Sequence, residues 1–329
     1  MEIETETGLG QSQMEAWIGR IRAGDVRTIA RTISAIEDGA PNVTKLLKQL
    51  FPLTGRAKIL GITGSPGAGK STLVDQIARE YRKAEKQIGI VAVDPTSPYT
   101  GGAILGDRIR MQAHHADPGI YIRSMATRGF LGGVARTTAD VTTVLDAAGR
   151  DIVIVETVGV GQDEVDIVRL ADVTVVLLVP GMGDDVQTIK AGIMEIADIF
   201  VINKADREGA DRVMREIRNM QTLAGNIRDD QWTAPIIKTV ANTGAGVTEL
   251  LETIARYEAH LTSKNLLTKR RASNWRERLV EMLREALLQR LMRESMTTEA
   301  LGEFALEIAE HKRDPYTLVE EAVERFKRS

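Results

Sequence analysis

Short apolar runs alternate with helical patterns between residues 58 and 261. The runs are rich in Val and Ile, and between them apolar residues recur at helical spacing, as Leu73, Ile77 and Tyr81 do. This alternation predicts an α/β fold with a doubly wound, mainly parallel sheet. The candidate strands are 58–63, 88–93, 120–124, 151–156, 173–179, 199–203 and 235–240.

Helical patterns without strands flank this region on both sides. In residues 1–57, apolar residues follow a spacing of three and four in Met14–Ile21, Val26–Ile36 and Val43–Phe51. We therefore expect an N-terminal helical region at 1–57 that caps the sheet of the domain at 58–261.

The C-terminal region, residues 262–329, is charged and helical. A broad apolar stripe runs from Trp275 to Leu291 and continues on later helices. Such a stripe must be buried, either against the sheet domain of the same chain or against a second copy in a symmetric dimer.

Composition narrows the classes of function. The chain has 329 residues, 43% of them hydrophobic, with a net charge of −3 and no cysteine. The charge argues against a nucleic-acid partner, and the lack of cysteine excludes disulfides and thiolate chemistry. No apolar run approaches the roughly 20 residues of a membrane span, and the acidic Glu2, Glu4 and Glu6 are unlike a targeting peptide, so we expect a cytoplasmic protein without membrane partners.

A glycine-rich stretch between a strand and a helix carries the strongest motif. It fits the P-loop pattern G-x-x-x-x-G-K-[ST], in which backbone amides and a helix N-terminus hold a polyphosphate. The lysine is expected to reach the β- and γ-phosphates, and the serine hydroxyl to bind Mg²⁺. The nucleotide-binding residues predicted here are Gly64, Ser65, Pro66, Gly67, Ala68, Gly69, Lys70, Ser71 and Thr72.

A second motif predicts which base is bound. Asn203, Lys204 and Asp206 form N-K-x-D at a strand end. The Asp206 carboxylate can accept hydrogen bonds from N1–H and the 2-amino group of guanine, whereas adenine offers neither donor. Lys204 would lie along the base, Asn203 would tie this loop to the P-loop, and Ala241 is a weaker candidate for a backbone contact to the guanine oxygen. The expected ligands are GTP and GDP.

A third constellation follows the strand at 151–156. Glu156 is placed to face the metal, and Gly159 to offer its amide to the γ-phosphate, so we predict Lys70, Glu156 and Gly159 as the catalytic set. Val160 stands where small signalling GTPases have a water-orienting Gln, which predicts slow intrinsic hydrolysis.

The metal site is expected to draw on four oxygen-bearing residues. Ser71, Asp94, Asp107 and Glu156 could surround one Mg²⁺, directly or through water. Either aspartate could instead be a helix cap or a turn residue.

The motifs together resemble one known family. The segments GITGSPGAGKSTL, VAVDPTSPYTGGAILGDRIRM, VIVETVGVGQ and PGMGDDVQTIKAGIMEIADIFVINKAD are similar to the MeaB/ArgK family, P-loop GTPases of the metallochaperone type that associate with methylmalonyl-CoA mutase. The resemblance implies GTP hydrolysis coupled to delivery of adenosylcobalamin to the mutase and to protection of that enzyme. It also implies a homodimer joined through the C-terminal arm, with the cobalamin on the partner.

The same resemblance gives a role to the loop 180–190. By composition this loop could be a surface loop with an Asp helix cap. In the family's pattern, Asp184, Gln187 and Lys190 couple the nucleotide state to the mutase.

Three other interpretations remain open at this point. One is a kinase that passes the γ-phosphate to an amino acid or a transport protein, although no catalytic-loop pattern supports it. Another is a nickel-delivering GTPase, although such proteins usually carry His-rich or Cys-containing sites. The last is a structural dimer in which the nucleotide only stabilises the fold.

Overall fold

The computed structural model describes residues 11–94, 117–126, 133–157, 170–181, 196–224, 232–294 and 296–328. The chain divides into two compact units, Met1–Arg271 and Ala272–Ser329. The larger unit holds the sheet and all the nucleotide motifs.

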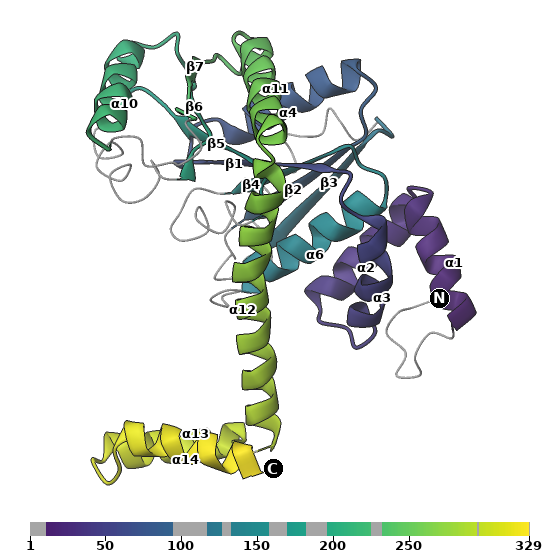
Figure 1. Ribbon diagram of the computed structural model, residues 1–329, viewed down its shortest axis with the longest axis vertical. Helices are drawn as coiled ribbons and strands as arrows, with labels where there is room; N and C mark the ends of the chain where they lie inside the picture. Colours follow the sequence, from purple (N-terminus) through teal and green to yellow (C-terminus); the bar gives the residue numbers. More distant parts are fainter. Residues whose placement is uncertain are drawn as a thin grey trace. The chain divides into compact units, whose positions relative to one another are not determined.

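A seven-stranded sheet forms the centre of the larger unit (Figure 1). Neighbouring strands are all parallel, in the order β3-β2-β4-β1-β5-β6-β7. Strands β2 to β4 lie on one side of β1 and β5 to β7 on the other, so the loop after β1 is at the switch point where open α/β sheets bind ligands. The strands are β1 (Lys58–Gly64), β2 (Ile88–Asp94), β3 (Ile120–Ala126), β4 (Ile152–Thr157), β5 (Val173–Leu178), β6 (Ile199–Ile202) and β7 (Ile236–Lys238). Each coincides with a predicted apolar run, and the doubly wound fold is confirmed.

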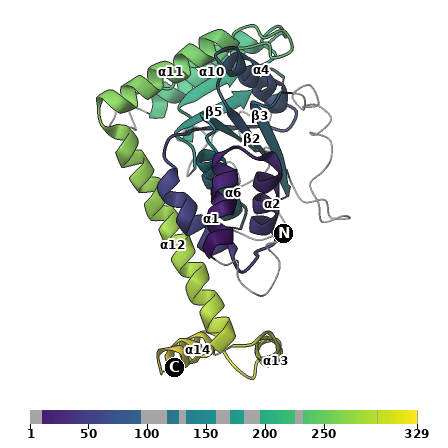
Figure 2. The ribbon, with the colours of Figure 1, turned by 90° about the vertical axis from the view of Figure 1, so that its right-hand side faces the viewer.

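Helices cover both faces of this sheet (Figures 1 and 2). On one face, α4 (Lys70–Lys83) and α11 (Val247–Ser263) pack on residues such as Leu60 and Ile62. On the other face, α6 (Gly133–Ala147) and α10 (Ala210–Ala224) pack on the intervening strand residues. Burial on both faces explains why the strands are continuous apolar runs rather than alternating ones.

Three N-terminal helices, α1 (Gln11–Arg22), α2 (Val26–Glu37) and α3 (Val43–Leu50), lie beside α6 (Figure 1). They share one apolar cluster with α6 and with strands β2 to β4. Trp17 is fully buried there, and its indole N–H donates to the Thr32 hydroxyl over 2.9 Å. These helices are therefore part of the core of the larger unit.

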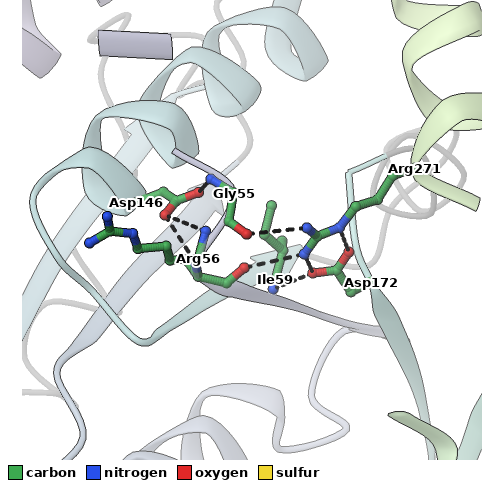
Figure 3. Close-up of polar contacts among 7 residues, drawn as sticks. Gly55, Arg56, Ile59, Asp146, Asp172 and Arg271 are labelled. Carbon is green, nitrogen blue, oxygen red and sulfur yellow. Dashed lines mark hydrogen bonds and ion pairs between the residues drawn. The ribbon is translucent and has the colours of Figure 1, made fainter. Parts of the chain in front are cut away.

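The segment that leads into β1 is held by two carboxylates at the amino-terminal edge of the sheet (Figure 3). Asp146, at the end of α6, accepts the backbone N–H groups of Gly55, Arg56 and Ala57 over 2.6–3.2 Å. Asp172, just before β5, accepts the N–H of Ile59 over 3.1 Å. Backbone donors that the sheet leaves without a partner at this edge are satisfied in this way.

The first turns of α12 (Leu266–Glu294) join the same edge through two consecutive arginines. Arg271 forms two 2.8 Å contacts with Asp172, visible in Figure 3, and the hydrogen bonds to this carboxylate raise the pKa of the guanidinium. Arg270 forms a similar fork, over 2.8 and 2.9 Å, with Asp198, which is fully buried just before β6. Bidentate pairs of this kind fix orientation as well as charge.

The second unit contains the rest of α12 together with α13 (Thr298–Ala309) and α14 (Pro315–Arg328). A small cluster around Met296 and Leu318 forms its core. Large apolar side chains on α12 are exposed, with Leu279, Leu283 and Leu287 at 50%, 61% and 56%. Within the described ranges, no helix combines the length and the apolar composition that a membrane crossing needs.

Candidate functional site

The loop between β1 and α4 curls tightly enough to require glycine at two positions. Gly64 has a φ of +139°, and a Cβ there would lie 2.2 Å from the carbonyl oxygen of Leu177 on β5. Gly69 has a φ of +88°, and its Cβ would lie 2.5 Å from the side-chain nitrogen of Asn203. The loop is thus pressed against β5 on one side and against the loop after β6 on the other, so the motif glycines are needed sterically as well as for their conformation.

Lys70 begins α4 and folds back over this loop. Its side chain is nearly buried, and Nζ donates to the carbonyl oxygens of Gly64 over 2.6 Å and Ser65 over 2.9 Å. The ammonium group and the N-terminus of α4 therefore lie at the same end of the loop. Both favour an anion, and together they could hold a polyphosphate.

Ser71 and Glu156 meet directly beside the loop. The Ser71 hydroxyl donates to Oε1 of Glu156 over 2.7 Å, and both residues are buried. A hydroxyl and a carboxylate are hard oxygen donors of the kind that Mg²⁺ prefers, so this pair fits two of its ligand positions.

Asp94 ends β2, which neighbours β4, so its backbone lies at the same edge of the sheet. Asp107, the fourth expected ligand, lies outside the described residues. Within the ranges that are described, no group of three or more His, Cys, Asp or Glu side chains could hold a metal ion. The four-residue metal site remains a prediction.

Asn203 joins three segments of the chain at the end of β6. Its amide nitrogen donates to the carbonyl oxygen of Ala68 in the P-loop over 2.8 Å. Its amide oxygen accepts the Thr239 hydroxyl over 3.1 Å and the N–H of Ala241 over 3.0 Å. The predicted tie between this loop and the P-loop is present in the structure, and it extends to the loop after β7.

The neighbouring residues place the predicted base-reading groups at the same edge. Lys204 has a φ of +55°, and its Nζ donates to the Gly67 carbonyl over 2.7 Å, so its stem spans from one loop to the other. Asp206 is exposed. Its accessible carboxylate next to this bridge suits a guanine reader, and the contact of Asp206 to the base remains a prediction.

The structure therefore brings together the P-loop, Glu156 and the Asn203–Asp206 loop, together with Ala241. Gly159 of the catalytic set and the coupling residues Asp184, Gln187 and Lys190 lie outside the described residues.

Three threonines near the site were missed by the motif analysis. Thr239 bonds Asn203, and the Thr63 and Thr157 hydroxyls bond each other over 2.9 Å. Thr63 and Thr157 each stand next to a motif residue, Gly64 and Glu156. A buried threonine at the end of an otherwise apolar strand was the available signal for both.

Comparison with known proteins identifies the family. The sequence matches the family described as Methylmalonyl Co-A mutase-associated GTPase MeaB over residues 29–296. It is 52% identical over 265 residues to a protein of Pyrococcus horikoshii that is named as a GTPase. The alignment covers 79% of this chain and 82% of that protein. It is 34% identical over 290 residues to GTPase ArgK of Escherichia coli, covering 86% and 87%.

A solved structure described as a LAO/AO transport system kinase has the same fold. It superposes with a TM-score of 0.71 at 27% identity, and the alignment covers 97% of this chain and 99% of the other. The matched region contains the P-loop, the Ser71–Glu156 pair and the loop around Asn203. The chain is therefore a GTP-binding GTPase of the MeaB family, a family associated with methylmalonyl-CoA mutase.

Proposed function

We propose that this GTPase is a chaperone of an adenosylcobalamin-dependent methylmalonyl-CoA mutase, and that GTP binding and hydrolysis drive cofactor delivery to the mutase and its protection. The family match carries this proposal, because it spans 29–296 and so includes the site and all of α12 as well as the sheet. A chaperone of this kind needs a nucleotide site whose occupancy is communicated to a partner.

The described residues support the proposed binding of GTP and Mg²⁺. Lys70 and the loop amides would bind the β- and γ-phosphates, Lys204 would lie along the guanine and Asp206 would accept its hydrogen bonds. Asn203 holds the base-reading loop against the P-loop through its bond to Ala68. Ser71 and Glu156 would hold Mg²⁺, which would supply positive charge against the phosphate oxygens.

Two further features support the proposed coupling to the mutase and the proposed homodimer. The loop Asp184–Lys190 follows β5, which pairs with β1, the strand that leads into the P-loop. The family resemblance implies that Gln187 and its neighbours relay a change from the nucleotide site to the mutase. The exposed leucines of α12 suit a homodimer joined through the C-terminal arm, because an apolar face of this kind is stabilised by burial against a second copy.

The decisive experiment measures GTP turnover by the purified protein alone and with the methylmalonyl-CoA mutase of the same organism, loaded with adenosylcobalamin. We expect slow turnover alone, stimulation by the mutase, and copurification of the two proteins. The mutase without GTPase is the background control. GTP turnover that the mutase leaves unchanged, together with no copurification, would contradict the chaperone role while leaving the GTPase assignment intact.

The kinase alternative is favoured by the description of the structural neighbour. It predicts that radiolabel from γ-labelled GTP moves to a basic amino acid or to a transport protein instead of to inorganic phosphate. The nickel-delivery alternative has no cysteine available for a metal site.

A further inference from the structure

The backbone ladder between β1 and β4 ends at the edge of the sheet where the nucleotide motifs lie. The backbone register between these strands ends at Ile62 and Glu156. Beyond that point β1 continues along β5, pairing Thr63 with Val176, while Thr157 of β4 pairs with Val93 of β2. Thr63 and Thr157 are therefore the first residues past the end of the ladder that joins these two central strands.

A side-chain hydrogen bond joins the two strands one residue past the end of the ladder. The Thr157 hydroxyl lies 2.9 Å from the Thr63 hydroxyl, and the two residues are 2% and 0% exposed. Thr63 precedes Gly64, whose carbonyl accepts Lys70, and Thr157 follows Glu156, which accepts Ser71. The bridge thus connects the two backbone points that carry the phosphate-binding and metal-facing groups.

Packing alone does not require hydroxyl groups at these two buried positions. Residues Ile59–Ile62 and Ile152–Val155 of the two strands are Ile, Leu and Val apart from Gly61, and valine has nearly the shape of threonine without the need for a buried hydrogen-bond partner. A hydrogen bond differs from an apolar contact in fixing distance and direction.

We propose that Thr63 and Thr157 are a positioning pair for GTP hydrolysis. Their hydrogen bond sets the spacing between the P-loop and Glu156 where the backbone ladder no longer does so. This inference concerns intrinsic hydrolysis and is independent of the mutase. The positioning role can therefore be wrong while the chaperone role is right, and the chaperone role can be wrong while the positioning role is right.

The test compares hydrolysis with stability in Thr63→Val, Thr157→Val and the double variant. A displacement of about 1 Å in a catalytic arrangement can cost around 10²-fold, so we expect each single variant to lower single-turnover GTP hydrolysis by roughly 10- to 100-fold. GDP affinity measured in EDTA should be unchanged, because the loop and the base-reading residues are intact. Thr157→Ser keeps the hydroxyl and should restore the rate.

The double variant separates positioning from packing. Each single valine leaves one buried hydroxyl without its partner, whereas the double variant removes both and should recover thermal stability. Under our proposal its hydrolysis stays as slow as in the single variants. Thr142→Val is a matched control, since it removes a buried hydroxyl bonded to Ala139 within α6 and should leave hydrolysis unchanged. Parental rates in the single variants, or a rate that recovers together with stability in the double variant, would overturn the inference.

Discussion

At the scale of single residues, Lys70 is a buried cation held within the P-loop. It is only 6% exposed, and its ammonium group lies among the carbonyl oxygens of its own loop. A positive charge held in place in this way needs little rearrangement when charge develops on a phosphate, and such fixed electrostatics often supply a large part of catalysis.

Lys70→Ala should therefore slow single-turnover GTP hydrolysis by about 10²–10³-fold, the loss expected when one preorganised charge or donor is removed. Lys83→Ala is the control, because Lys83 is on the same helix but is largely exposed and pairs with Glu80 on the surface. An unchanged rate in Lys70→Ala would show that the Gly64–Ser71 loop is not the catalytic cradle.

Asp206 is predicted to set the choice of base in the same region. In Asp206→Asn, one acceptor becomes a donor facing the donors of guanine, and hydrogen bonds to a charged group are worth about 1.5–3 kcal/mol each. We expect GTP affinity to fall by roughly 10²-fold or more, while xanthosine nucleotides, which have a carbonyl at C2, gain relative to GTP. Equilibrium titration with both nucleotides checks this. Glu208→Gln, an exposed acid two positions later, should bind GTP as the parent does.

At the scale of elements, the site is an assembly of loops fastened to one another. Asn203 connects the loops after β1, β6 and β7, and Ser71 connects α4 to β4. Because direct hydrogen bonds link the loops, we expect a change in one loop to affect its neighbours.

The loop Asp184–Lys190 is the predicted extension of this assembly toward the mutase. Gln187→Ala and Lys190→Ala should leave nucleotide affinity and basal hydrolysis nearly intact and reduce only the mutase-stimulated rate, because alanine removes contacts formed in the complex. Turnover with and without mutase measures the effect. Equal proportional loss of the basal and stimulated rates would place this loop in the active site itself.

The sequence predicted the elements well because the strands are buried on both faces and so appear as unbroken apolar runs. The P-loop and the N-K-x-D loop were predictable because each is a local motif at a strand end. The Thr63–Thr157 bond was not, since it depends on β4 lying beside β1, which places residues 94 positions apart in contact. The anchoring of Arg270 and Arg271 depends on sheet order in the same way.

At the scale of the whole molecule, Arg270 and Arg271 attach the start of α12 to the base of the sheet. Burial lowers the pKa of Arg270, but the charge and hydrogen bonds of Asp198 raise this pKa by a larger amount. The net shift of the pKa is upward, so the guanidinium stays charged. Asp198 also accepts the Tyr257 hydroxyl and the N–H of Thr174.

Arg270→Met should lower the free energy of unfolding of the larger unit by about 3–5 kcal/mol, because it leaves the buried Asp198 charge without its guanidinium. Urea unfolding measures the change. Arg284→Met on the same helix removes an exposed pair with Glu281 and should change stability little. Similar stability of the two variants would mean that Arg270 does not anchor the helix.

The position of Arg271 near the start of α12 also determines when its contacts can form during synthesis of the chain. Arg271 is synthesised 99 residues after Asp172 and 216 residues after Gly55, both of which it contacts. While the chain grows on the ribosome, the aspartates before β5 and β6 are present long before the cations that neutralise them. The base of the sheet is thus completed only once the start of the C-terminal arm has emerged, and a fragment ending at Leu261 would carry every nucleotide motif yet lack the two charges that close the fold.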